Sequence, residues 1–184
     1  TLIDSGAVYL FTFANSDFSG VAQASVIGWD YPAGFSVKLS PADAFGAAVS
    51  LDAGRLVVGA PGQGAAFLFS FAGSNFAGPR LHDILSSDFA GQRNVSVGQL
   101  SAGDQFGGSV SLNGTRLAIG APFDDGADET QLDSGAVYLF SFSDLAFNAP
   151  VLEAIIGLGY SGGKNVSVAT LGEQDLFGAS VSLD

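Results

Sequence analysis

Short apolar runs separated by glycine-rich turns recur along this chain of 184 residues. In the stretch 109–113, valine and leucine alternate with serine, which is the period-two pattern of a strand with one buried face. The Asn113-Gly114 pair that follows is typical of a tight hairpin turn. Residues 117–119 are apolar throughout, as in a strand buried on both faces, and Pro122 ends that run. The pattern therefore predicts antiparallel hairpins.

Three motifs repeat in a fixed order, and internal repeats of this length indicate a repeat architecture. Phe-Gly starts a strand at Phe45, Phe106 and Phe177. Gly-Ala-Pro closes the returning strand 14 positions after the first two of these phenylalanines. Ser-Gly-Ala-Val-Tyr-Leu-Phe stands at 5–11 and 134–140, and a variant stands at 64–69. We therefore expect three units, 1–63, 64–133 and 134–184, with the last one incomplete.

Each unit is predicted to hold about four strands. The first two form the hairpin after Phe-Gly, and the stretch 137–142 is the next strand of its unit. The similar stretches 94–97 and 165–168 are predicted to be the fourth strand. The loop between Pro122 and Phe140 is ten residues longer than its counterpart, as expected for an insertion outside the packed strands.

Together these motifs resemble FG-GAP repeats, which form the blades of the integrin α-subunit propeller and occur in many bacterial surface proteins. The resemblance covers nearly the whole chain and implies an all-β fold of β-propeller-type blades, each of about four antiparallel strands. The integrin-type Asp-x-Asp-x-Asp-Gly calcium loop is replaced by the short turns 52–54 and 113–115. The resemblance is therefore to the short bacterial variety, without that calcium loop.

Three units are fewer than the four to eight blades of a closed propeller. We therefore expect one of three arrangements: part of a longer chain, a ring of several chains, or exchange of strands between chains in a fibre. The terminal strand at 179–184, which has no returning strand after it, is an edge of the kind that pairs with another chain.

The acidic composition narrows the classes of partner. Eighteen acidic and 6 basic side chains give a formal net charge of -12, which disfavours nucleic-acid binding and attraction to anionic membranes. The chain has no cysteine and no apolar run of transmembrane length, so we expect neither disulfides nor membrane insertion. Together with the family resemblance, these features indicate an extracellular or cell-surface protein.

The longer loop carries five carboxylates within ten positions, and oxygen ligands of this kind suit Ca²⁺. Calcium is therefore a candidate cofactor, with a solvated acidic loop as the alternative. The candidate ligands are Asp124, Asp125, Asp128, Glu129 and Asp133.

Other polar residues recur with the repeat and are predicted to be structural. An aspartate two residues before each Phe-Gly, at positions 43, 104 and 175, is expected to accept hydrogen bonds from backbone N–H groups in a turn. Arg55 and Arg116 occupy matching positions and are expected to pair with acids on an exposed face. Phenylalanines five residues apart recur in each unit, where they either pack between blades or form a platform for carbohydrate.

Ligand binding and modification have few candidates. Trp29 and Tyr31 occur in the first unit alone and are therefore candidates for a specific contact. Asn94 and Asn165 stand in Asn-Val-Ser, the acceptor pattern for N-glycosylation. His82, the single histidine, is expected on the surface in a variable connection, and the other two units have no equivalent histidine, so no enzyme is predicted.

The sequence thus predicts a structural or adhesive surface module, for example a subunit of a filament or of an assembled propeller. Its partners would be copies of itself or the remainder of a longer chain. The alternatives are a propeller that binds a cell-surface glycan or protein, and a non-catalytic domain of a larger secreted enzyme.

Overall fold

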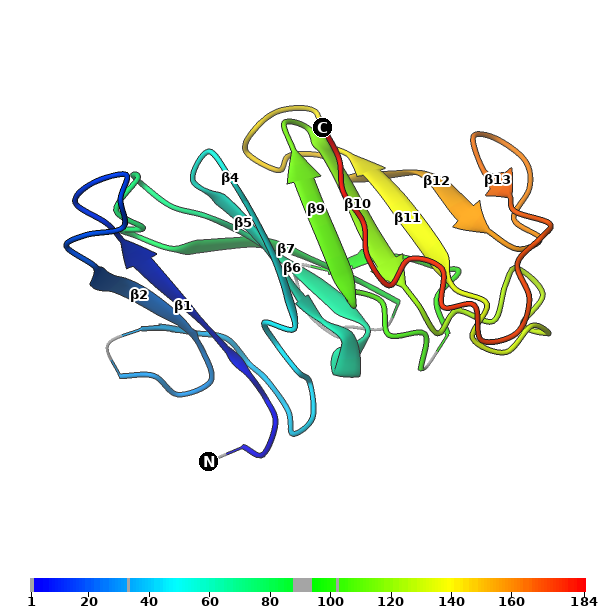
Figure 1. Ribbon diagram of the computed structural model, residues 1–184, viewed down its shortest axis with the longest axis horizontal. Coiled ribbons are helices and arrows are strands. Elements are labelled where there is room, and N and C mark those ends of the chain that lie inside the picture. The colour runs from blue at the N-terminus through cyan, green and yellow to red at the C-terminus, as the bar shows by residue number, and fades with distance from the viewer. Residues whose placement is uncertain (1, 33, 88–93, 102) are drawn as a thin grey trace.

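The computed structural model describes residues 2–32, 34–87, 94–101 and 103–184. In that part of the chain three β-sheets stand side by side in sequence order (Figure 1). The first contains β1 (Ala7–Thr12), β2 (Ala22–Gly28) and β3 (Phe35–Ser36). The second contains β4 (Ala48–Asp52), β5 (Arg55–Ala60), β6 (Ala65–Ser70), β7 (Arg80–Ser86) and β8 (Asn94–Ser96). The third contains β9 (Ser109–Asn113), β10 (Arg116–Ala121), β11 (Ala136–Ser141), β12 (Val151–Gly157) and β13 (Val166–Ser167).

This arrangement confirms the predicted all-β fold. One short 3₁₀ turn, Pro61–Gln63, joins β5 to β6. Within the described residues there is no helix with the length and hydrophobicity that crossing a bilayer requires. The second and third sheets each begin just after a Phe-Gly motif, so the expected unit limits after 63 and 133 fall inside these sheets, between β5 and β6 and between β10 and β11.

The strand order reveals strands that the sequence patterns did not predict. In the second sheet the order is β4-β5-β6-β7-β8, where the first four strands are antiparallel and β8 runs parallel to β7. The third sheet repeats this order with β9 to β13. The Asn-Val-Ser stretches therefore form a fifth strand, and the fourth is β7 or β12. β7 lies in a segment predicted to be a connection, and no strand was predicted at β12. Buried residues gather at one end of each of these strands instead of alternating, so neither has the usual strand pattern.

The first hairpin of each five-stranded sheet closes with a two-residue turn. Asp52 pairs with Arg55, and Ala53 and Gly54 between them have positive φ angles of 47° and 78°. The position of the glycine in Asp52-Ala53-Gly54 predicts a three-residue loop with a bulge. That prediction is wrong because Ala53 adopts the left-handed conformation that glycine or asparagine usually supplies. In the third sheet Gly114 has the positive φ that the Asn-Gly pair predicted, at 56°.

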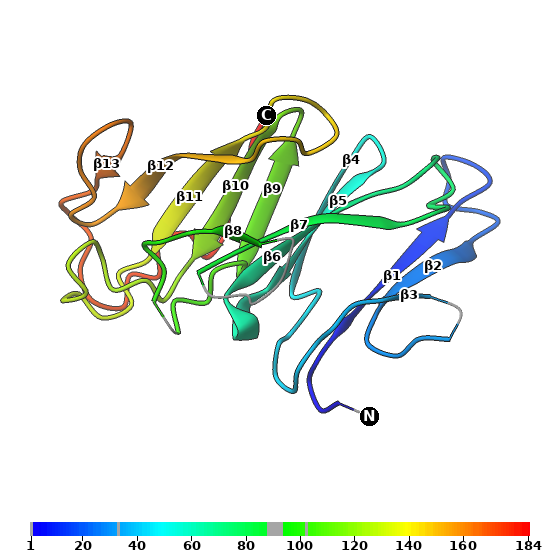
Figure 2. The same ribbon diagram turned by 180° about the vertical axis from the view of Figure 1, so that it is seen from behind.

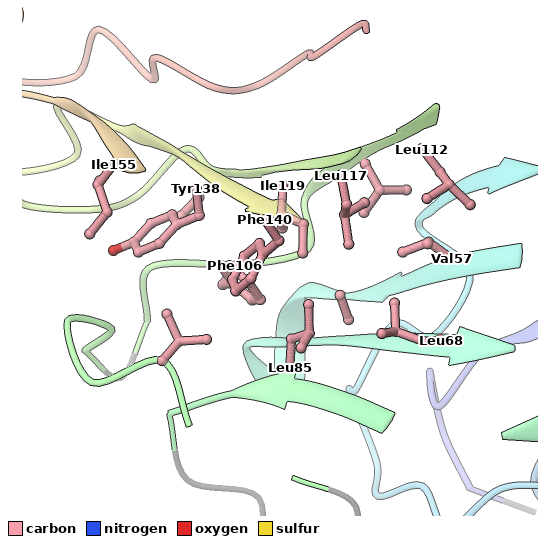
Figure 3. Packing of buried hydrophobic residues seen from close by; sticks show 14 of the residues in the cluster. Val57, Leu68, Leu85, Phe106, Leu112, Leu117, Ile119, Tyr138, Phe140 and Ile155 are labelled. Atoms are coloured by element: carbon pink, nitrogen blue, oxygen red, sulfur yellow. The ribbon is translucent and has the colours of Figure 1, made fainter. Parts of the chain in front are cut away.

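The core lies between the sheets rather than within one of them. Leu56 and Val58 of β5 pack in one cluster with Val8 and Leu10 of the first sheet. Val57, between them, faces the opposite way and packs with residues of the third sheet (Figure 3). Figure 2 shows the third sheet standing beside the second. The return strand is therefore buried on both faces, as predicted, because the neighbouring sheets cover the apolar side chains on each side of it.

Hydrogen bonds between serine hydroxyls and backbone N–H groups join consecutive repeats. The Ser50 Oγ accepts a hydrogen bond from the Leu112 N–H at 2.9 Å, and Ser111 Oγ accepts the equivalent bond from Leu183 N–H at 2.9 Å. Residues 177–184 thus continue the repeat by lying alongside the third sheet, as the red end of the chain in Figure 1 shows.

Candidate functional site

The acidic loop after β10 buries one carboxylate under two tyrosines. Asp124 is 1% exposed, and its Oδ2 accepts hydrogen bonds from the hydroxyls of Tyr138 at 2.7 Å and Tyr160 at 2.9 Å. Its Oδ1 accepts a third bond from Gly126 N–H at 2.9 Å. Burial raises the pKa of Asp124, and these hydrogen bonds partly offset that rise. The group is a closed polar network at the edge of the apolar cluster that contains both tyrosines, and Figure 3 shows Tyr138 in that cluster.

The five predicted calcium ligands do not converge. Asp125 accepts a hydrogen bond from the Asp133 backbone N–H at 2.7 Å, and Asp128 accepts one from the Thr130 hydroxyl at 2.7 Å. Asp128 and Glu129 are exposed, whereas Asp124 is buried. Among the described residues no three or more acidic, histidine or cysteine side chains are placed to hold a metal ion. The geometry therefore gives no support to the predicted calcium site, because the loop uses three of these carboxylates to order itself.

The aspartates before Phe-Gly have the predicted role in turns. Asp43, Asp104 and Asp175 each accept a hydrogen bond from the backbone N–H three residues earlier, at 2.6, 2.7 and 2.8 Å. Burial raises the pKa of Asp104 to about 7, and the nearby negative charges of Asp124 and Glu129 add to the rise.

Trp29 and Tyr31, the predicted ligand residues, line one pocket in the first sheet. This pocket has a volume of about 520 Å³ and is also lined by Asp4 and Asp30. The Tyr31 hydroxyl lies 3.1 Å from that of Tyr9. Trp29 and Tyr31 therefore line the same pocket, as a shared ligand site requires.

Tyr31 is not unique to the first unit, however. It stands three residues after Gly28, as Tyr160 stands three residues after Gly157, and in each case the tyrosine ring packs over the glycine. The shared spacing Gly-x-x-Tyr is the sequence signal that identifies Tyr31 and Tyr160 as equivalent positions. Trp29 remains specific to the first unit.

The two predicted glycosylation positions are equivalent in the repeat: Asn94 begins β8, and Asn165 immediately precedes β13. Asn165 is half-buried, and its Oδ1 accepts the Ile155 backbone N–H at 2.8 Å while its Nδ2 donates to the Ser161 carbonyl at 3.3 Å. That amide takes part in the fold, which disfavours a bulky glycan there. The backbone of Asn94 lies in β8, and its side chain falls outside the described part of the structure.

His82 lies in β7 rather than in a connection. Its Nε2 is 2.7 Å from Ser70 Oγ, and its ring packs on Phe147 with centroids 5.7 Å apart. Arg55 pairs with an acid, Asp52, as predicted, but it is buried rather than on an exposed face, and its guanidinium lies 5.4 Å from the Phe147 ring centroid. Both residues belong to the contact between the second and third sheets.

The repeated phenylalanine pairs become progressively more buried along the chain. Their rings meet edge to face, with centroids 4.9 to 5.2 Å apart in the three units. Phe142 and Phe147 are buried, the second pair is half-buried, and Phe13 and Phe18 are 47% and 73% exposed. The buried pair packs against the preceding sheet through Phe147, which agrees with packing between blades.

The strand β1 shows the same gradient. Tyr9 and Phe11 are 49% and 45% exposed, whereas the residues at their positions in β6 and β11 are at most 2% exposed. These equivalents are Phe67, Phe69, Tyr138 and Phe140. In β6 they face the first sheet, and in β11 they face the second. The first sheet therefore presents outward an aromatic face, Tyr9, Phe11, Phe13 and Phe18, whose counterparts are partly or fully buried.

Residues 99–140 match the family model of the FG-GAP repeat. The chain carries an FG-GAP repeat. The matched segment begins in the turn before Phe106, includes β9 and β10, and ends in β11. The three sheets, each repeating the same strand order as far as it extends, are consistent with FG-GAP propeller-like blades. No curated protein matches the chain.

Proposed function

We propose that this FG-GAP chain is a structural and adhesive module of a secreted or cell-surface protein, and that copies of it stack head to tail. The observation that carries the proposal is the outward aromatic face of the first sheet. Large exposed apolar patches are uncommon on monomeric proteins and usually mark interaction sites.

The contacts within the chain indicate what kind of surface would cover this face. In both internal junctions the equivalent aromatics pack against the opposite face of the preceding sheet. On the third sheet this face includes Leu139 of β11, which is half-buried, whereas Val137 of the same face is already buried within the chain. A chain whose first sheet packs on the third sheet of another copy forms heterologous contacts, which generate rings or filaments.

The charge of the chain fits an extracellular setting. A net charge of -12 keeps the surface away from phosphate backbones and anionic lipid headgroups. It also predicts that stacking strengthens as salt rises, because screening reduces repulsion between like-charged copies while the apolar contact is unaffected.

Sedimentation velocity over a concentration series tests this proposal. We expect the weight-average mass to rise with concentration and the rise to disappear in Phe13→Asp/Phe18→Asp. Val166→Asp is the matched control, since Val166 is 51% exposed on β13, away from the aromatic face. A chain that stays monomeric at every concentration, or that responds equally to both changes, contradicts the proposal.

A second function is favoured by the pocket at Trp29. An indole ring beside carboxylates in an open pocket is a combination that suits a sugar, because the ring stacks on apolar C–H groups while the acids accept hydroxyl hydrogen bonds. A glycan array probed with the chain and with Trp29→Ala tests it. Signals retained by the variant, or an array without signals, would rule this function out.

A further inference from the structure

We propose that Asn113-Gly114 is a latent site of self-catalysed deamidation, and that Asp52 of the preceding sheet keeps it unreactive while the second and third sheets stay in contact. The pair is the single Asn-Gly of the chain. Glycine makes this reaction easier than any other following residue does, because without a Cβ the backbone can approach the asparagine side chain closely. The inference concerns a junction inside one chain, so it goes beyond the proposed stacking of copies and does not depend on it.

The nucleophile of the reaction is the backbone nitrogen of Gly114. This nitrogen gives its proton to hydroxide or water and attacks Cγ, the side-chain amide carbon of Asn113. The N–Cγ bond forms, the Cγ–Nδ2 bond breaks, and Nδ2 takes up a proton and leaves as ammonia. Water then opens the resulting cyclic succinimide at either of its carbonyls, which leaves aspartate or isoaspartate at position 113. The reaction therefore requires a Gly114 nitrogen that is free to lose its proton and to turn toward the side chain.

In the folded chain the Gly114 nitrogen is held by a carboxylate. The turn between β9 and β10 lies beside the first hairpin of the second sheet (Figure 1), and the Gly114 N–H donates to Asp52 Oδ2 at 2.9 Å. A hydrogen bond to a carboxylate is about twice as strong as one between neutral groups. The carboxylate charge also opposes loss of the proton, because the nitrogen anion would lie next to it. Asp52 therefore disfavours the first step of the reaction.

Asp52 is held in place by Arg55, its partner in the β4–β5 hairpin. The Arg55 Nη2 pairs with the Asp52 carboxylate, and its Nη1 donates to the Gly114 carbonyl at 2.6 Å. Asn113 is the last residue of β9, where it pairs with Arg116. Formation of the ring requires rotation about the Cα–C bond of Asn113 away from the extended conformation of a strand. Both polar groups of the Gly114 backbone are bonded to the neighbouring sheet, so the turn has to leave that sheet before the ring closes.

The other Asx-Gly pair of the chain, Asp125-Gly126, is an internal comparison. Aspartate forms the same succinimide with loss of water. Here too a carboxylate holds the glycine nitrogen, since the N–H of this glycine donates to Asp124 Oδ1 at 2.9 Å. Asp124 is the neighbouring residue in the same loop, whereas Asp52 lies 62 positions before its partner. Protection of Asn113 therefore depends on contact between the two sheets, and protection of Asp125 does not.

Deamidation would make a transient opening of the junction permanent. The product carries a carboxylate in place of the neutral Asn113 amide, one residue from the N–H that Asp52 holds, and like charges repel. Isoaspartate also adds one carbon to the main chain of the turn, so the Gly114 N–H does not return to its place. The turn thus acts as a chemical record of loosening between the second and third sheets.

The test is incubation of the full chain in mildly alkaline buffer, followed by digestion and mass spectrometry of the peptides. Water enriched in heavy oxygen labels the product with one heavy oxygen atom. We expect the folded chain to deamidate at Asn113 at least about tenfold more slowly than the same chain unfolded in urea, since the bond to Asp52 has to break first. Asp52→Ala should raise the rate in the folded chain at least about tenfold. Asp52→Asn, which keeps an acceptor oxygen without the charge, should give an intermediate rate.

Ser50→Ala is the matched control. It removes a different hydrogen bond across the same junction, from the Leu112 N–H, and leaves the bond of Gly114 in place. This variant should leave the rate at Asn113 unchanged. Formation of isoaspartate at Asp125 in the same digests reports general unfolding, and it should stay at the wild-type level in every variant.

Three results would overturn the inference. They are equal rates at Asn113 in the folded and the urea-unfolded wild-type chain, an unchanged rate in Asp52→Ala, and an equal rise in Asp52→Ala and Ser50→Ala. A rise at Asp125 that matches the rise at Asn113 would also contradict it, because the variant would then expose both sites by unfolding. Circular dichroism verifies the fold of each variant.

Discussion

Replacement of Gly59 by alanine tests the close contact between repeats. Its Cβ would lie 1.9 Å from the carbonyl oxygen of Gly107 and 2.9 Å from the carbonyl carbon, so the backbone of the third sheet has to move by about 1 Å. No flexible side chain is available to move instead, because the groups met are all backbone. We expect a loss of about 3 kcal/mol in the free energy of unfolding, the upper end of the usual cost of overpacking.

A matched glycine separates this effect from backbone conformation. Gly54 has a φ of 78°, and a Cβ at this position would have nothing within 4 Å, so Gly54→Ala should cost only about 1 kcal/mol for the left-handed conformation. Urea unfolding followed by circular dichroism measures both variants, and the thermal midpoint of Gly59→Ala should fall by about 10 °C. Equal losses for the two variants would refute the idea that contact between repeats, rather than backbone freedom, requires glycine in Gly-Ala-Pro.

Three further predictions concern buried polar groups. Because the pKa of Asp104 is raised to about 7 in the fold, the folded state binds more protons than the unfolded state between about pH 4 and 7, so the stability of the protein should fall as pH rises through that window. Asp104→Asn should flatten the stability–pH profile measured by urea unfolding. Asp175→Asn, at an exposed copy of the same turn, should leave the profile unchanged. Tyr160→Phe should cost about 1 to 2 kcal/mol because it removes a hydrogen bond from the buried Asp124, while Tyr31→Phe in the more exposed pair should cost little; equal thermal shifts would contradict this. Arg55→Met should cost about 2 kcal/mol of stability, since the buried Arg55 side chain contacts Asp52, the Gly114 carbonyl and Phe147. Arg116→Met should cost much less because that arginine is exposed. A larger loss at Arg116 in the same assay would be inconsistent with these contacts.

Much of the fold could be predicted because local patterns and repeats coincide. The hairpin that begins at each Phe-Gly has the alternation, turn residues and apolar return strand that identify it without tertiary information. β7 and β12 could not be found in this way. Their outer ends are exposed and their inner ends are buried by the neighbouring sheet, so their pattern depends on tertiary packing.

The candidate sites were harder to predict, since equal sequences have unequal surroundings. The carboxylates of the long loop suggest a metal site when they are counted along the sequence, but Asp124 is directed inward by two tyrosines that lie 14 and 36 residues further along the chain. Arg55 and Arg116 share one repeat position, yet one is buried and the other exposed, because Phe147 of the third sheet covers the first. Composition and spacing do not contain that information.

The longer loop between β10 and β11 acts as a structural clamp. Ala127 N–H donates to the Leu158 carbonyl at 3.0 Å, which joins the loop to the end of β12. The carbonyls of Leu132, Asp133 and Ser134 accept the backbone N–H groups of Gln174, Leu176 and Phe177 at 2.8, 3.1 and 3.1 Å, which joins it to the start of the next repeat. Between these two attachments the loop encloses Asp124 against its tyrosines. A carboxylate held in this way stabilises a junction between repeats.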